Sequence, residues 1–113
     1  PHGASLASAA ILVLTSLLDA ASAGRMASEL VEARLAACVQ IGAPVRSLYH
    51  WRERLETATE IPLAIKTRAD AWPALARAIR ERHPYELPEI VAVSLTDALP
   101  EYLDWIDAQT RPG

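Results

Sequence analysis

The stretch from His83 to Ile90 gathers several side chains that could do chemistry. It reads His83-Pro84-Tyr85-Glu86-Leu87-Pro88-Glu89-Ile90, so an imidazole, a phenol and two carboxylates lie close along the chain. Each proline fixes its own φ near about −65° and pushes the preceding residue towards extended backbone. The apolar run that follows, Ile90-Val91-Ala92-Val93, is typical of a buried strand. A stiff polar loop that leads into a core strand is a common place for a binding site.

The elements that must position this loop are predicted from the spacing of apolar residues. Short continuous apolar runs indicate strands, and apolar residues at helical spacing indicate amphipathic helices. Strands are expected over residues 10–15, 37–49, 60–67 and 89–95. Helices are expected over about 23–36, 71–82 and 100–108. The polar stretch 52–59 is expected to be a hairpin connection.

Caps and chain breakers refine these predictions. Ser22 and Asp70 are suitable N-caps for the first two helices. Gly42 and Pro44 predict a bend or bulge inside the second strand. Pro62 lacks an amide donor, which predicts that part of the third strand lies on a sheet edge.

The order of the elements predicts an α+β fold. Strands and helices alternate as β-α-β-β-α-β, followed by a C-terminal helix, which is the ferredoxin-like pattern with an antiparallel sheet. The third strand is apolar at both parities, with Ile61, Leu63 and Ile65 on one side and Ala64 on the other. A strand of this kind needs cover on both faces. A homo-oligomer that packs sheets together would supply it, and closed rings are the usual form.

Length and composition restrict the class of protein. The 113 residues suffice for one domain, expected over 10–113 after a flexible segment 1–9. A 51% apolar content indicates a globular chain, and a net charge of −3 argues against a nucleic-acid partner. The apolar stretch 4–18 is too short and too interrupted to span a bilayer. The single cysteine, Cys38, excludes an internal disulfide and fits a cytoplasmic location.

Five segments together resemble the CutA family of divalent-cation tolerance proteins. They occur in the family's order and cover about residue 10 to residue 107. The segments are Arg34-Leu35-Ala36-Ala37-Cys38-Val39, Ser47-Leu48-Tyr49-His50-Trp51, the stretch from Glu60 to Arg68, the His83–Ile90 loop, and Tyr102-Leu103-Asp104-Trp105-Ile106.

The resemblance implies a ferredoxin-like homotrimer, similar in architecture to the PII nitrogen-regulatory proteins. It also implies a role in tolerance of divalent cations, above all copper, and copper binding by some members. One segment departs from the family. Members commonly place a Thr-Cys-Pro turn after the first strand, where this chain has Thr15-Ser16-Leu17. A copper mechanism that needs this second thiol is therefore not expected here.

The side chains that could bind copper or another divalent cation are Cys38, His83, Glu86 and Glu89. Thiolate suits copper(I), whereas imidazole and oxygen ligands suit copper(II). One cysteine and one histidine per subunit cannot complete a tetrahedral site. A three-subunit ring could contribute each group three times, or could pair Cys38 of one subunit with His83 of the next. Packing as a small apolar residue is the alternative for Cys38. Capping of a helix C-terminus is the alternative for His83.

A second hypothesis is a PII-like sensor that binds a small anionic ligand in clefts between subunits. The candidate cleft residues are Tyr49, Trp51, Lys66, Arg68 and Tyr85. Tyr49 and Trp51 are also suited to anchor a subunit interface, and Lys66 could simply extend to water. A third hypothesis is a non-catalytic scaffold. The sequence has no glycine-rich phosphate loop, paired-histidine zinc motif or nucleophile elbow, so neither an enzyme nor an organic cofactor is expected.

Overall fold

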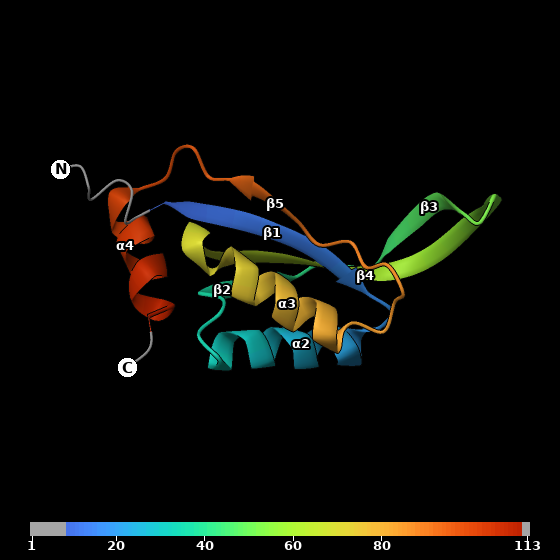
Figure 1. Cartoon of the computed structure of the whole chain (residues 1–113), viewed down its shortest axis with the longest axis horizontal. Helices are drawn as coiled ribbons and strands as arrows, with labels where there is room; N and C mark the ends of the chain where they lie inside the picture. The colour runs from blue at the N-terminus through green and yellow to red at the C-terminus, as the bar shows by residue number, and fades with distance from the viewer. Residues whose placement is uncertain (1–8, 112–113) are drawn as a thin grey trace.

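The computed structural model describes residues 9–111, so the predicted flexible segment 1–9 lies outside the described residues except for Ala9. An antiparallel sheet carries two helices on one face and a third helix at one end (Figure 1). In chain order the elements are β1 (Ala10–Leu17), α2 (Ala20–Glu32), β2 (Cys38–Ile41), β3 (Val45–Trp51), β4 (Arg54–Arg68), the 3₁₀ turn η1 (Ala69–Ala71), α3 (Trp72–Arg82), β5 (Val91–Ser94) and α4 (Pro100–Gln109).

The sheet has the topology that the sequence predicts. Its strands lie in the order β2-β4-β1-β5, and each neighbouring pair is antiparallel. Because α2 follows β1 and α3 follows β4, the chain forms the βαββαβ pattern with the added C-terminal helix α4. The prediction of a ferredoxin-like α+β fold is confirmed.

The strand β4 is much longer than predicted. Its first half, from Arg54 to Glu60, pairs with β3, and its second half pairs with β1 and β2. The predicted connection 52–59 is therefore wrong. Only Arg52 and Glu53 form the turn, with φ of 51° and 66°. Positive φ at both central residues matches the right-handed twist of a two-residue hairpin, so the strands continue up to the turn. This hairpin projects from the body at the end opposite to α4 (Figure 1).

The predicted second strand is interrupted where Gly42 and Pro44 predict a bend. It divides into β2 and β3, which pair with different parts of β4. β4 lies between β2 and β1, but at Pro62 its ladder partner is on β1 alone, which is the local edge that the proline predicts. The proline is tolerated because β2 ends at Ile41, opposite Leu63. Beyond that pair, the Pro62 carbonyl still accepts a hydrogen bond from the Gly42 amide.

Two helix starts differ from the predictions. The N-cap of α2 is Asp19, whose carboxylate accepts from the Ser22 amide at 2.7 Å, so Ser22 lies in the first turn. These contacts hold the pKa of Asp19 below its ordinary value. Asp70 does not cap α3, because η1 precedes that helix and Asp70 pairs with Arg68. The helix α2 also ends before the predicted residue 36, since Arg34 turns the chain with φ of 62°.

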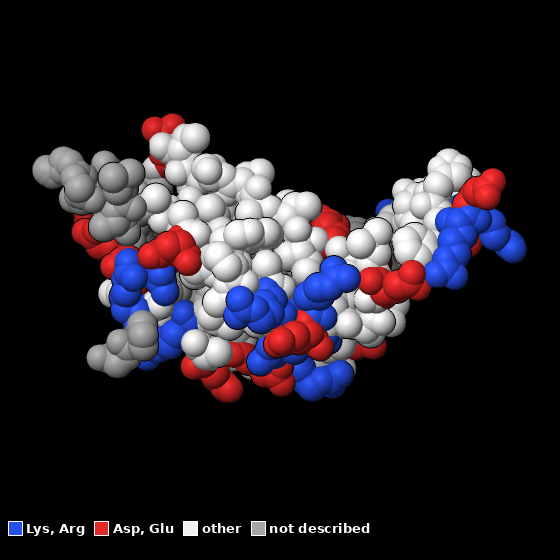
Figure 2. Space-filling view, viewed as in Figure 1, with Lys and Arg blue, Asp and Glu red and all other residues white. Residues whose placement is uncertain are grey.

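The two faces of the sheet differ in their cover. One face packs against α2 and α3 and forms the main core, which includes Val13, Leu30, Leu63, Ile65, Leu75 and Ile79. The opposite face, which we call the uncovered face, carries the alternate residues of each strand: Leu12, Leu14, Cys38, Gln40, Ala64, Lys66, Val91 and Val93. Charged side chains gather on the helix layer and at the hairpin tip, and the surface above them is largely uncharged (Figure 2). Within residues 9–111, no helix is long and apolar enough to cross a membrane.

Candidate functional site

A pocket of about 620 Å³ lies between the β3–β4 hairpin and the loop that follows α3. The surface is visibly hollowed between the body and the projecting hairpin (Figure 2). The loop belongs to the 83–90 stretch with its two prolines, and the hairpin residues come from β3, the turn and β4. The lining residues are Ser16, Ser47, Leu48, Tyr49, His50, Trp51, Arg52, Glu60, Tyr85, Glu86, Leu87 and Glu89.

The carboxylate of Glu60 is the buried polar group of this pocket. The residue is 8% exposed, and the Tyr85 hydroxyl donates to its Oε2 at 2.8 Å. Burial by itself raises the pKa of Glu60. Hydrogen bonds from Ser47, Tyr85 and Ser16 together lower the pKa by more than burial raises it, so the pKa lies below its ordinary value of 4.5. Glu60 is therefore ionised at neutral pH and held by hydroxyl donors.

Tyr85 is held in place by the same contact. Burial and the hydrogen bond to Glu60 raise the pKa of Tyr85, so its hydroxyl stays protonated and remains a donor. Its ring lies edge-on to the His83 ring, with centroids 4.6 Å apart. The tyrosine thus connects the loop to the hairpin strand β4.

His83 fastens the loop to the end of β1. Its Nε2 lies 2.7 Å from the Ser16 carbonyl oxygen, and the Tyr85 amide donates to Nδ1 at 3.2 Å. These partners require the neutral tautomer with the proton on Nε2. His83 is also the C-cap residue of α3, which is the position that the capping alternative gives it. Its buried side chain, however, makes its hydrogen bonds to Ser16 and Tyr85. Both ring nitrogens are engaged, so a metal ion could bind only by displacing one partner.

The rim of the pocket carries a guanidinium between a carboxylate and an aromatic ring. Arg52 donates from one nitrogen to both oxygens of Glu86, at 2.8 and 3.1 Å. Its guanidinium carbon lies 5.3 Å from the centroid of the Trp51 ring. Because both charged side chains are about 70% exposed, this ion pair contributes little to stability.

The predicted metal ligands do not come together within one chain. Cys38 is a free, half-buried thiol on β2, opposite Lys66 and at the level of Leu12 on β1. His83 is bonded to Ser16, four residues further along β1, which is about 13 Å at strand spacing. The two predicted carboxylates line the pocket near His83. Among residues 9–111, no three His, Cys, Asp or Glu side chains could share one metal ion.

The predicted ligand-cleft residues fall into two groups. Tyr49, Trp51 and Tyr85 line the pocket. Lys66 does not, because it lies on the uncovered face and donates to Gln40 Oε1 at 2.9 Å.

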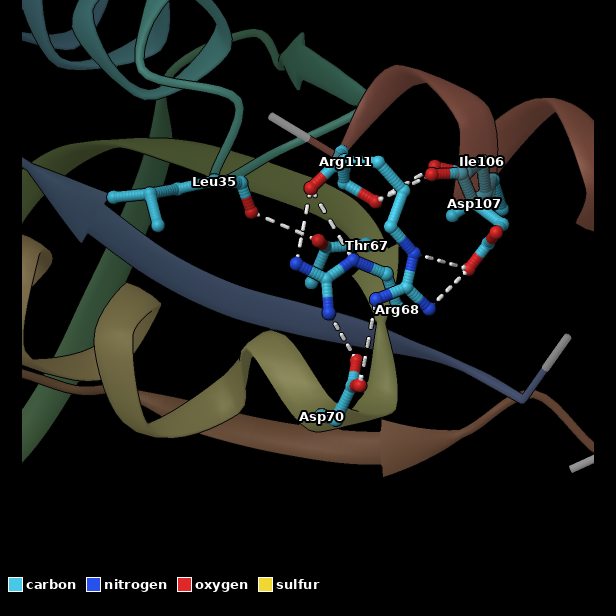
Figure 3. A network of polar contacts seen from close by, with 8 residues as sticks. Leu35, Thr67, Arg68, Asp70, Ile106, Asp107 and Arg111 are labelled. Carbon is cyan, nitrogen blue, oxygen red and sulfur yellow. Dashed lines mark hydrogen bonds and ion pairs between the residues drawn. The ribbon is translucent and has the colours of Figure 1, made fainter. Parts of the chain in front are cut away.

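Arg68 is part of a polar network at the other end of the molecule (Figure 3). It donates to the Thr110 carbonyl at 2.9 and 3.2 Å and pairs with Asp70. Arg111 pairs with Asp107 at 2.7 Å and also reaches Asp70. This network fastens the end of α4 to β4, so Arg68 has a structural role.

Seven of the twelve pocket residues were not predicted from the sequence, and Glu60, Arg52 and Ser16 are among them. Glu60 opens the apolar part of β4, and a carboxylate next to such a run was a signal that could have identified it. Arg52 carried no such signal, since it reads as a turn residue. Ser16 stands at the position where the resembling family commonly has a cysteine, and its hydroxyl here donates to Glu60.

Comparison with known proteins agrees with this architecture. Residues 11–109 match the family model described as CutA1 divalent ion tolerance protein. A divalent-cation tolerance protein CutA from Pectobacterium atrosepticum is 36% identical over 102 residues, which cover 90% of this chain and 93% of the relative. The crystal structure of CutA1 from Shewanella sp. SIB1 is 39% identical, covers 91% of this chain and 96% of that one, and superposes with a TM-score of 0.88. CutA1 from Oryza sativa is 30% identical, with 93% and 96% coverage and a TM-score of 0.89. This chain therefore belongs to the CutA1 divalent ion tolerance family.

Proposed function

We propose that this chain is a non-catalytic, metal-binding protein that acts in tolerance of divalent cations, with copper as the first candidate and a homotrimer as its working form. Family membership supports the class of function. The single cysteine supports the cytoplasm as its location. The relative from Archaeoglobus fulgidus is described as periplasmic, so location is a property to measure for each member.

The uncovered face of the sheet is the observation that supports the trimer. It exposes Leu14, Val91 and Val93 to 36%, 47% and 53%. Contiguous exposed apolar side chains are typical of interaction surfaces. A closed ring of three copies would cover this face in each subunit.

The positions of the candidate ligands favour a metal site between subunits. Cys38 lies on the uncovered face, whereas His83, Glu86 and Glu89 lie at the pocket end of the molecule. Because these groups are too far apart within one chain, we propose that Cys38 of one subunit acts with the loop residues of the next. Thiolate, imidazole and carboxylate together are a ligand set that copper accepts. His83 would bind the ion after releasing one of its two hydrogen bonds.

A calorimetric titration of the purified protein with copper(II) tests this proposal. Saturable binding at a simple ratio per subunit is expected, and the Cys38→Ser and His83→Gln variants should each bind at least about tenfold more weakly. His50→Gln is the matched control, because His50 is an exposed histidine of β3 outside the proposed ligand set. If only His50→Gln lost copper binding, the ion would be bound by the exposed His50 and not by the proposed ligands, and this would contradict the proposal. The trimer is tested by analytical ultracentrifugation with and without copper.

Lys66 supports the second candidate function, a sensor for a small anion in clefts between subunits. Its ammonium group lies on the uncovered face and, in the part of the chain that the structure describes, donates to Gln40. Titration with inorganic phosphate separates the two functions, since Lys66→Met should abolish anion binding and leave copper binding unchanged. A trimer that binds neither probe would instead support the scaffold.

A further inference from the structure

The pocket beside the hairpin contains a buried negative charge, the carboxylate of Glu60. None of the ion pairs within residues 9–111 involves Glu60, although this carboxylate is 8% exposed. Its hydrogen-bond donors are the hydroxyl groups of Ser47, Tyr85 and Ser16, and His83 adds a smaller electrostatic attraction. Charges buried in proteins are usually paired, since burial without a counter-charge is costly.

The walls of the pocket add aromatic surface and further negative charge. Tyr49 and Trp51 come from β3, and Glu86 and Glu89 come from the loop. The basic side chains that line the pocket are His50 and Arg52, and the guanidinium of Arg52 is already paired with Glu86. An aromatic wall beside a carboxylate favours a cation, because the ring face is electronegative.

Arg52 shows how such a cation can be held here. Its guanidinium lies over the Trp51 ring and binds the Glu86 carboxylate at the rim. Tyr49 and the buried Glu60 line the same pocket. A ligand cation in this pocket would therefore meet the same kinds of groups, an aromatic ring and a carboxylate, that already bind a guanidinium at the rim.

The size of the pocket favours an organic cation over a single metal ion. About 620 Å³ is within the range of small-molecule sites. The carboxylates around it do not converge, since no three acidic, histidine or cysteine side chains among residues 9–111 could hold one metal ion. An organic cation can extend its apolar part along the aromatic wall and place its charge at Glu60.

We propose that this pocket binds a small organic cation, an alkylammonium or alkylguanidinium compound, with its charge at the Glu60 carboxylate and its apolar part against Tyr49 and Trp51. The site shares the loop residues Glu86 and Glu89 with the proposed intersubunit copper site, but it uses neither Cys38 nor His83 and places its ligand at Glu60. It also differs from an anion site, since Lys66 and Arg68 lie elsewhere.

The test is an NMR titration of the ¹⁵N-labelled full chain with n-butylammonium chloride. The Trp51 indole N–H should shift and saturate, whereas those of Trp72 and Trp105, which do not line this pocket, should stay in place. n-Butanol, which lacks the charge, and inorganic phosphate are the comparison probes. Neither should give a saturable shift of the Trp51 signal.

Three variants locate the charge. Glu60→Gln keeps the shape of the side chain and should weaken n-butylammonium binding by about tenfold or more. Glu81→Gln on the exposed surface of α3 makes the same change of charge outside the pocket and should bind as the parent does. Arg52→Asn removes the competing guanidinium and suits the left-handed backbone at this position, so it should bind n-butylammonium several-fold more tightly.

The opposite results would overturn the proposal. These are no saturable shift with n-butylammonium, equal binding of n-butanol, or equal affinity in Glu60→Gln with an unchanged spectrum elsewhere. If Glu60→Gln unfolds, Arg52→Asn still decides the question, since unchanged or weaker binding in that variant contradicts a cation site beside Trp51. Saturation of the Trp51 signal by copper(II) without any effect of n-butylammonium would assign the pocket to the metal instead.

Discussion

Replacing Tyr85 by phenylalanine tests the hydrogen bond that holds the buried carboxylate of Glu60. The substitution keeps the ring that contacts His83 and removes only the hydroxyl, which lies 2.8 Å from Glu60 Oε2. Glu60 then keeps its serine donors but loses the tyrosine. A hydrogen bond to a charged group contributes about 1.5–3 kcal/mol, so the free energy of unfolding should fall by that amount at pH 7.

The pH dependence of this loss follows from the pKa of Glu60. Its pKa in the folded protein lies below the ordinary value of 4.5, so the ionised form is stabilised by folding. That contribution is fully present above about pH 4.5 and is lost as the pH falls through the lower, folded value. In Tyr85→Phe the folded pKa moves back towards 4.5. Below both values Glu60 is neutral, and the lost hydrogen bond costs only about 0.5–1.5 kcal/mol.

Urea unfolding at pH 7 and again near pH 3, at one fixed protein concentration, measures both quantities. The fixed concentration matters because unfolding of an oligomer depends on it. The destabilisation by Tyr85→Phe should be larger at pH 7 than at acid pH. In the Glu60→Gln background, which has no charge to lose, the difference between the two pH values should disappear. A loss that is equal at both pH values, or larger in acid, would refute the role given to this hydrogen bond.

Three further substitutions test the fold around the site. Gly42→Ala places a Cβ 2.9 Å from the Pro62 ring, so the free energy of urea unfolding should fall by about 1–3 kcal/mol. The Cβ added by Gly24→Ala in α2 meets no atom within 4 Å, so the free energy of unfolding should rise by about 0.5–1 kcal/mol. A change of the same sign in both glycine variants would contradict this reasoning. Arg68→Met removes the donors to the Thr110 carbonyl and should speed amide hydrogen exchange at the end of α4, and unchanged exchange would exclude that role.

Local patterns in the sequence were sufficient for most elements of the fold. Within residues 9–111, apolar runs and helical spacing located at least part of each of the five strands and the three α-helices. The predicted N-caps were wrong, and the apolar run predicted to be a buried strand forms the exposed strand β5. The other errors lie where long-range pairing decides. The residues from Arg54 to Thr59 are polar, yet they form a strand because β3 pairs with them. Pairing with β3 is a long-range contact that these polar residues do not predict by themselves.

The sequence by itself determined the fold class and the family, because periodicity and the five resembling segments are properties of short stretches of chain. It also identified the 83–90 loop and the pocket aromatics Tyr49, Trp51 and Tyr85. Only the tertiary structure decided which groups act together. It brings Glu60 to Tyr85 across 25 positions of the chain and separates Cys38 from His83. The reason is physical: the environment of a charge depends on its neighbours in space, and strand pairing sets them.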